Sequence, residues 1–131
     1  MNSKSIVAAL VLAAAVNTPD RTFARAKDYA FQPVKAEVKK GEDVTIAVRL
    51  IRKATRKPII DAVVTPTRID MAPDGMAEMA SQVAALPTGE PGIYAFKTDL
   101  SMEGRWLFSV AAKVRGEPET VIGKVIFKAT K

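Results

Sequence analysis

The sequence predicts an all-β fold, a single immunoglobulin-like antiparallel β-sandwich of about seven strands that follows an N-terminal signal peptide. After residue 27, apolar and polar residues alternate over several short stretches, which is the period of a half-buried strand. Turn signals rich in Gly and Pro separate these stretches at intervals of about 8–12 residues or a little more. The likeness to an immunoglobulin domain is architectural only, because the chain has no Cys and therefore lacks the disulfide of antibody domains.

The first two predicted strands precede a basic loop. Residues 29–38 form the first strand, and Pro33 interrupts it, which is typical of an edge strand or a bulge. Residues 39–42 (KKGE) form a turn, and residues 43–51 form the second strand. The apolar face of this second strand carries Val44, Ile46, Val48 and Leu50.

The middle of the chain contains two more predicted strands. Residues 52–60 form the basic loop, and residues 62–69, rich in Val and Thr, form the third strand. Residues 70–79 are predicted to be a loop, and residues 80–86 a short fourth strand. A helical turn is the alternative over residues 76–85.

The last three predicted strands are separated by short connections. The turn signal PTGEPG at residues 87–92 precedes the fifth strand, which has Tyr94 and Phe96 on one face. The remaining elements are the fifth strand at 93–100, a loop at 101–104, a strand at 106–114, a turn at 115–118 and a strand at 120–128. Apolar residues alternate along the sixth strand at Trp106, Phe108, Val110, Ala112 and Val114. In the seventh strand they fall at Val121, Val125 and Phe127.

The N-terminus has the pattern of a secretory signal peptide. Lys4 gives a positive start, residues 6–16 are apolar, and Ala24-Arg25-Ala26 offers a cleavage site. We therefore predict a signal peptide at residues 1–26 and a mature periplasmic domain at residues 27–131. The apolar run is shorter than the roughly 20 residues of a spanning helix, and an uncleaved anchor is the alternative.

Composition excludes several classes of function. Without Cys or His, the chain has no thiol nucleophile, no thiolate zinc site and neither the commonest metal ligand nor the commonest general base. No phosphate-binding loop or nucleophile elbow is present, and we predict that the protein is not an enzyme.

Five basic residues cluster in and beside the predicted loop at 52–60. They are Arg49, Arg52, Lys53, Arg56 and Lys57. No aromatic residue stands among them to stack on bases, so we predict no nucleic-acid partner for this protein of net charge +6. A solvated hairpin end is the simplest interpretation, and docking to an anionic membrane or an acidic partner is the alternative.

Four methionines besides Met1 are the most informative residues of the chain. Met71, Met76 and Met79 fall in one segment, and Met102 lies further on. Thioether sulfur is the only soft ligand in the sequence, and thioethers favour Cu(I). We therefore predict that these four residues are the metal ligands of a copper site, with Cu(I) as the cofactor.

Strand counting places the four methionines together. In an antiparallel sandwich the odd-numbered connections lie at one end and the even-numbered connections at the other. The predicted loop at 70–79 is the third connection and the loop at 101–104 is the fifth, so both belong to one end. The turn at 39–42 is their neighbour, and the basic cluster lies at the opposite end.

Carboxylates and an indole surround the predicted site. Asp70, Asp74, Glu78 and Glu103 lie beside the sulfurs, where they would attract a cation. Asp70, Asp74, Glu78 and Trp106 are the predicted contacts for a protein partner, such as an efflux or oxidase complex. Two alternatives remain for the methionines: they pack the end of the sandwich, or they form a metal-free docking surface.

Three motifs in residues 61–127 resemble the YtkA-like family, which is related to the periplasmic part of FixH. The first is Ile69-Asp70-Met71-Ala72-Pro73, followed by Met76 and Met79. The second is Pro91-Gly92-Ile93-Tyr94, and the third is Met102-Glu103-Gly104-Arg105-Trp106.

The resemblance implies a small β-sandwich outside the cytoplasmic membrane that takes part in copper handling, oxidase assembly or metal efflux. It also implies that Met71, Met76, Met79 and Met102 carry the function. The sequence departs from the family pattern where Ala72 separates Met71 from Pro73, and it has no His, which restricts the expected ion to Cu(I).

Overall fold

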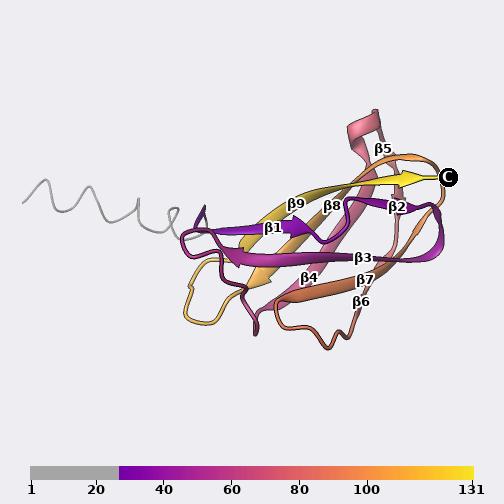
Figure 1. The fold of residues 1–131 in the computed structure, drawn as a ribbon. Helices are drawn as coiled ribbons and strands as arrows, with labels where there is room; N and C mark the ends of the chain where they lie inside the picture. Colours follow the sequence, from indigo (N-terminus) through magenta and orange to yellow (C-terminus); the bar gives the residue numbers. More distant parts are fainter. Residues whose placement is uncertain (1–26) are drawn as a thin grey trace, which may run out of the picture.

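Two β-sheets face each other in the computed structural model, which describes residues 27–131 (Figure 1). The predicted all-β sandwich is therefore confirmed. The predicted signal peptide at residues 1–26 lies outside the described residues. Within residues 27–131, no helix combines the length and apolar character needed to cross a bilayer.

Nine strands make up the described part of the chain. They are β1 (Tyr29–Pro33), β2 (Glu37–Lys39), β3 (Gly41–Arg52), β4 (Val63–Met71), β5 (Met76–Ser81), β6 (Val83–Leu86), β7 (Ile93–Leu100), β8 (Gly104–Lys113) and β9 (Val121–Thr130). A short 3-10 turn, η2 (Ala72–Asp74), links β4 to β5. The four-stranded sheet has the order β1-β3-β7-β6, and the five-stranded sheet has the order β2-β9-β8-β4-β5. All neighbours are antiparallel except β2 and β9, which are parallel.

The first predicted strand, residues 29–38, is two strands in different sheets. β1 pairs with β3 and ends at Pro33, whereas β2 pairs with β9. Proline has no N–H and a fixed φ, so its place at the end of β1 suits a break in the ladder. After the crossing, the Lys128 N–H donates to the Ala36 carbonyl over 2.8 Å.

The predicted loop at 70–79 and strand at 80–86 are also replaced by two strands. β5 belongs to the five-stranded sheet and β6 to the four-stranded sheet, and Gln82 alone connects them. The Thr98 hydroxyl donates to the Gln82 carbonyl over 2.6 Å and so holds this second crossing. The helical alternative at 76–85 is wrong. These two splits account for nine strands where about seven were predicted.

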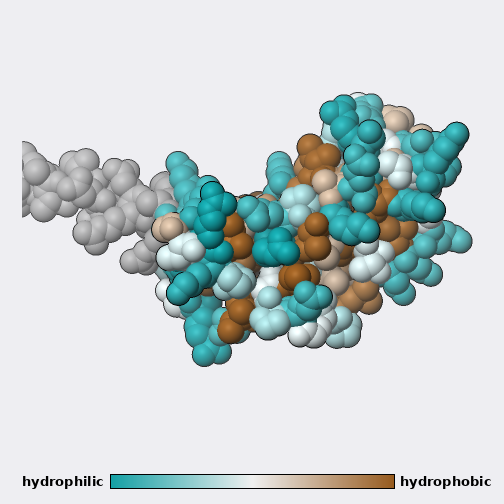
Figure 2. Space-filling view, viewed as in Figure 1, coloured by the Kyte–Doolittle hydropathy of each residue, from teal (hydrophilic) through white to brown (hydrophobic). Residues whose placement is uncertain are grey.

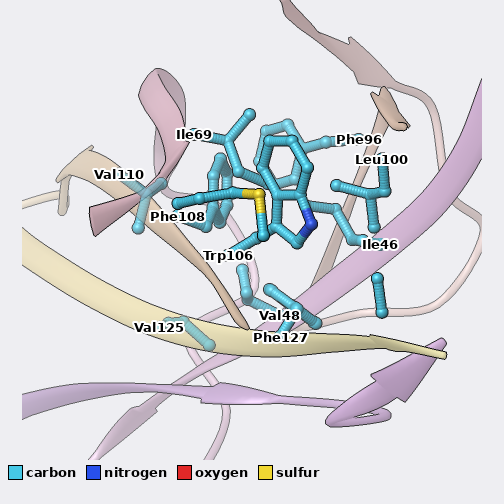
Figure 3. Close-up of a cluster of buried hydrophobic side chains, with 12 residues drawn as sticks. Ile46, Val48, Ile69, Phe96, Leu100, Trp106, Phe108, Val110, Val125 and Phe127 are labelled. Carbon is cyan, nitrogen blue, oxygen red and sulfur yellow. The ribbon is translucent and has the colours of Figure 1, made fainter. Parts of the chain in front are cut away.

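The core lies between the sheets and is built from alternate residues of the long strands (Figure 3). The rings of Phe96 and Phe108 have centroids 5.0 Å apart, and those of Phe108 and Phe127 are 6.3 Å apart. Burying such a side chain contributes about 1.5–3 kcal/mol. The predicted inward faces are confirmed at Ile46, Val48, Leu50, Phe96, Trp106, Phe108, Val110, Ala112, Val125 and Phe127, which are all buried.

One glycine lets the sheets approach where β1 passes β9. The ring of Phe31 lies so close to Gly123 that a Cβ on Gly123 would overlap it. Phe31 lies on the four-stranded sheet and Gly123 on the five-stranded one. Glycine is therefore the residue that fits this position of β9.

Apolar side chains also reach the surface. Figure 2 shows hydrophobic patches in the middle of one face, with hydrophilic side chains projecting around them. The large hydrophobic residues that are exposed are Val34, Ile60, Val63, Met102, Ile122 and Ile126. Single exposed apolar residues are ordinary, so only those that share a face need an explanation.

Candidate metal centre at the methionine hairpin

The β4–β5 hairpin brings the first three methionines together. Met71 and Met76 are directly opposed in the register, so their side chains are cross-strand neighbours. The register then shifts, because Asp70 pairs with Ala80 and residues 77–79 are extra on β5. This irregularity explains how Met76 and Met79, three residues apart, both pack against the core.

A tight turn closes this hairpin. Pro73 lies in the first turn of η2, where its missing N–H costs no hydrogen bond. Gly75 has φ +76°, a left-handed conformation that suits glycine, and its N–H donates to the Ala72 carbonyl over 2.9 Å.

The four methionines differ in exposure. Met71 is 0 % exposed and belongs to the core, whereas Met102 is 37 % exposed. Met76 and Met79 are half-buried and pack against the core cluster. The four methionines therefore range from the buried Met71 under the hairpin to the accessible Met102 on the neighbouring loop.

The loop at 101–104 meets the hairpin at Gly104. A Cβ on Gly104 would lie 2.5 Å from the Met71 methyl carbon and 2.5 Å from Asp74 Oδ2. Gly104 has φ +138°, a region that side chains rarely adopt. Two residues earlier, the Met102 carbonyl accepts a hydrogen bond from Trp106 Nε1 over 3.2 Å. The hairpin and this loop thus share one end of the sandwich.

The two methionine-bearing loops lie at the same end, as strand counting predicted, although two strands were not predicted. β5 and β6 are joined through Gln82 alone, so together they occupy the place of one predicted strand. β7 then returns towards the hairpin. The number of chain reversals between the two loops therefore equals the predicted number.

Asp74 fastens the hairpin to β8. Its Oδ2 accepts the Arg105 backbone N–H over 2.8 Å, and its Oδ1 accepts Arg105 Nε over 2.8 Å. Arg105 Nη2 also donates to the Pro73 carbonyl over 2.7 Å. The backbone N–H of Arg105, followed by its guanidinium, holds the pKa of Asp74 below its ordinary value.

Asp70 is a second fixed carboxylate, and it is 6 % exposed. It accepts the Ala72 N–H over 2.8 Å and forms an ion pair with the Arg68 guanidinium. Burial is the largest influence and raises the pKa of Asp70. The Ala72 hydrogen bond, the Arg68 bond and charge, and the Lys124 charge together outweigh it, so the pKa lies below its ordinary value.

The four residues predicted to contact a partner differ in their burial and in the side chains that hold them. Trp106 is 1 % exposed in the core and has almost no surface to offer a partner. Asp70 and Asp74 are held by arginines, and Glu78 is exposed on β5. Glu103 is exposed on the loop before β8. Among residues 27–131, no group of three or more Asp, Glu, His or Cys side chains is arranged to hold a metal ion.

Two arginines that hold these carboxylates were not singled out from the sequence. Arg68 and Asp70 are two residues apart on a strand, a spacing that places side chains on one face, so the signal was present. Arg105 and Asp74 are 31 residues apart, and nothing local in the sequence links them.

The basic loop lies at the opposite end, as predicted. The Tyr94 hydroxyl, near the start of β7, donates to the Ile59 carbonyl over 2.6 Å and accepts the Ala62 N–H over 3.2 Å. Gly92 contacts Pro58. The methionine hairpin and Gly104 lie instead beyond the other end of β7, at Leu100.

Several solved structures resemble this fold at low sequence identity. A conjugative transposon lipoprotein from Bacteroides eggerthii is 11% identical over 76% of this chain and 96% of its own, with a TM-score of 0.43. Domains 4 and 5 of the S-layer protein SbsC are 18% identical over 79% of this chain, which spans 51% of that structure, with a TM-score of 0.37. The C-terminal domain of ZirS is 14% identical over 78% of this chain and 66% of its own, with a TM-score of 0.42.

The sequence comparisons settle the family. No curated protein matches this chain. The YtkA-like family model matches residues 23–111, which include the methionine hairpin, residues 92–94 and the loop that leads to Trp106. The chain therefore belongs to the YtkA-like family.

Proposed function

We propose that this YtkA-like protein is exported to the periplasm and binds Cu(I) through methionine thioethers at the hairpin end of the sandwich. It acts as a carrier or accessory protein in copper handling or oxidase assembly. It catalyses no reaction, and its partner is a periplasmic or membrane protein that delivers or accepts the ion.

The observation that carries this proposal is the convergence of the methionine-bearing segments. Met71 and Met76 face each other across the hairpin, and the Met71 methyl group touches the Gly104 position. Met102 is two residues from Gly104. Met71 and Met102, which are 31 positions apart in sequence, therefore lie in segments held at one end of the sandwich.

The donor chemistry at this end fits a soft ion. Thioethers prefer Cu(I), and the chain offers neither His nor Cys to compete with them. The nearby carboxylates Asp70 and Asp74 are committed to arginines, which leaves them little capacity to bind a hard cation. A bound Cu(I) would give this end of the protein a transferable metal ion.

Graded exposure suits capture and release. Met102 is accessible to an incoming donor, and Met76 and Met79 stand at the boundary of the core. Met71 lies beneath them, where apolar neighbours exclude water from the sulfur. The Asp74–Arg105 contacts fix the hairpin against β8, so binding orders few further residues.

A competition titration tests the proposal. Residues 27–131, which contain both core clusters, are titrated anaerobically with Cu(I) against a chromophoric chelator. We expect stoichiometric binding that withstands the chelator. The variant Met71→Leu/Met102→Leu removes one sulfur from each converging segment and should abolish this binding. Methionine-to-leucine changes nearly conserve volume, and each should cost less than about 1.5 kcal/mol of stability.

A control adds a thioether at the far end of the molecule. Leu86→Met introduces a sulfur beside the turn at 87–92 and should leave the copper stoichiometry unchanged. Wild-type affinity in the folded double variant would refute the assignment of the site. If Leu86→Met bound an additional Cu(I) as tightly as the wild-type site does, a thioether at any place on the sandwich would suffice for copper binding.

The second candidate is a metal-free interaction module, and the complete burial of Met71 favours it. In that case the methionines pack the end of the sandwich, and Glu78 and Met102 contact a protein complex. A photo-crosslinker at position 78, compared with one at Thr55 on the opposite loop, separates the candidates. A specific adduct from position 78 in a protein that fails to bind Cu(I) would establish the module.

A further inference from the structure

The outer face of the five-stranded sheet mixes aliphatic and basic side chains. On β9 the outward positions are Ile122, Lys124, Ile126 and Lys128, which alternate with the buried Val125 and Phe127. The register aligns these residues with outward positions of β8: Ile122 with Ala111, Lys124 with Ser109 and Ile126 with Leu107. Hydrophobic and cationic rows therefore alternate across this face.

A shallow hollow lies beside the apolar positions of this face. Val63 is 66 % exposed and Ile122 is 65 % exposed, although both are strongly hydrophobic. Between their strands lies the small side chain of Ala111 on β8. A hollow of about 310 Å³ forms there, lined by Val63, Thr65, Ala111, Ala112, Lys113 and Thr120.

The positive charge of this face is not cancelled by its carboxylates. Lys113, Lys124 and Lys128 form no ion pair within residues 27–131. The carboxylates on and beside the face are mostly occupied, since Asp70 pairs with Arg68 and Asp74 with Arg105. Glu37 on β2 stands opposite Lys128 in the register without an ion pair between them.

We propose that this face docks on the surface of a bilayer that contains anionic phospholipid. Val63, Ile122 and Ile126 enter the headgroup boundary, and the three lysines contact lipid phosphates. The positive charge of this face is complementary to the negative charge of such a bilayer, and this complementarity identifies the bilayer as the partner. Lysines beside aliphatic residues suit such a surface because the long side chain buries its methylenes and extends its ammonium group to the phosphate.

The composition of the face favours lipid over a protein partner. Protein interfaces are enriched in aromatic residues, Met and Arg, and depleted in Lys. The outward positions of β8 and β9 carry three lysines, three large aliphatic residues and Arg105, but no aromatic side chain in the described fold. The guanidinium of Arg105 is already bound to Asp74. Docking on this face would also hold the protein at the membrane, where a copper donor or acceptor embedded in the bilayer is within reach.

Vesicle binding tests this proposal. The full chain is titrated separately with phosphatidylglycerol vesicles and with phosphatidylcholine vesicles. Residues 1–26 are the same in every variant, so differences between variants do not come from that segment. We expect preferential binding to phosphatidylglycerol. In Lys124→Gln/Lys128→Gln this binding should weaken about 25-fold, or about fivefold for each lysine. Ile122→Ser/Ile126→Ser should lose the residual binding that persists in about 0.5 M salt, where charges are screened.

A matched control changes the same charge elsewhere. Lys53→Gln/Lys57→Gln on the opposite loop lowers the net charge equally and should alter phosphatidylglycerol binding by less than about twofold if contact is local. An equal loss in this control would overturn the assignment to the β8–β9 face. Failure of the wild-type chain to distinguish the two lipids would overturn the membrane proposal. So would retention on immobilised polyglutamate without vesicle binding, which would assign the face to an acidic protein.

Discussion

Asp70 is the only charged residue that is buried within residues 27–131, and two short-range contacts hold it. Arg68 lies two residues before it on β4, and the Ala72 N–H lies two residues after it. A buried carboxylate must be paired or hydrogen-bonded, and local sequence supplies both partners here. The sequence predicted Asp70 as a contact for a partner, but its side chain is buried and held by the Ala72 N–H and Arg68. Alternation along β4 separates Asp70 from the apolar positions Ile69 and Met71, but it does not show whether the polar position is buried as well.

The low pKa of Asp70 makes the stability of the fold depend on pH. Burial, the largest influence, raises this pKa, but the Ala72 and Arg68 contacts lower it further than burial raises it. Because the folded-state pKa lies below the unfolded value of about 3.9, the carboxylate stabilises the fold above that pH. This contribution disappears as the pH falls through the folded-state pKa. Asp70→Asn should cost about 1–3 kcal/mol at neutral pH, a difference that narrows below about pH 4 in urea denaturation curves.

An exposed ion pair provides the control. Asp61 pairs with Arg115 over 3.3 Å, but their side chains are 51% and 84% exposed. Asp61→Asn should therefore cost less than about 1 kcal/mol at any pH. Equal and pH-independent losses in both variants would show that Asp70 is not held as a low-pKa carboxylate.

At the scale of elements, the strands that remain in one sheet were predicted best. The predicted strand at 93–100 has the same bounds as β7, and residues 43–51 lie within β3, because alternation against one core gives an unbroken period of two. The crossings were missed because alternation records which face of a strand is apolar but not which sheet the strand joins. Gln82 turns the chain between sheets without Gly or Pro, and the three-residue spacing of Met76 and Met79 is not a strand period.

The contact between the hairpin and β8 depends on the missing side chain of Gly104. Gly104→Ala places a methyl group against the Met71 methyl carbon and Asp74 in a backbone region that side chains rarely adopt. Strain and overlap together should cost about 2–5 kcal/mol, measured by chemical denaturation. Gly75→Ala is the matched control, since Gly75 also has a positive φ but nothing lies within 4 Å of its added Cβ. It should cost only about 1–2 kcal/mol. Identical costs would mean that backbone strain alone matters and that the packing of Gly104 against Met71 does not.

At the scale of the whole molecule, the two ends of the sandwich have different chemistry. The methionine end carries thioethers and paired carboxylates, and the other end carries the basic loop. Strand counting predicted this separation because chain reversal is a topological property that survives errors in strand bounds. It could not predict that Met71 lies in the core, since burial at the end of a sandwich depends on how η2 and the loop at 101–104 fold over it.

Copper binding at one end should stabilise the whole domain if the proposed site is correct. A ligand that binds only the folded state stabilises it by about 2.7 kcal/mol at 100 times its Kd. For a domain of this size, that free energy corresponds to a rise in Tm of about 10 °C or more. Wild-type protein should show this rise with anaerobic Cu(I), and Met71→Leu/Met102→Leu should not. Hydrogen exchange should slow mainly at residues 71–79 and 101–105, because local opening of either segment would break the bound copper site. A rise in Tm shared by the double variant, or protection centred on the basic loop, would place the copper elsewhere and leave the methionines as packing for the end of the core.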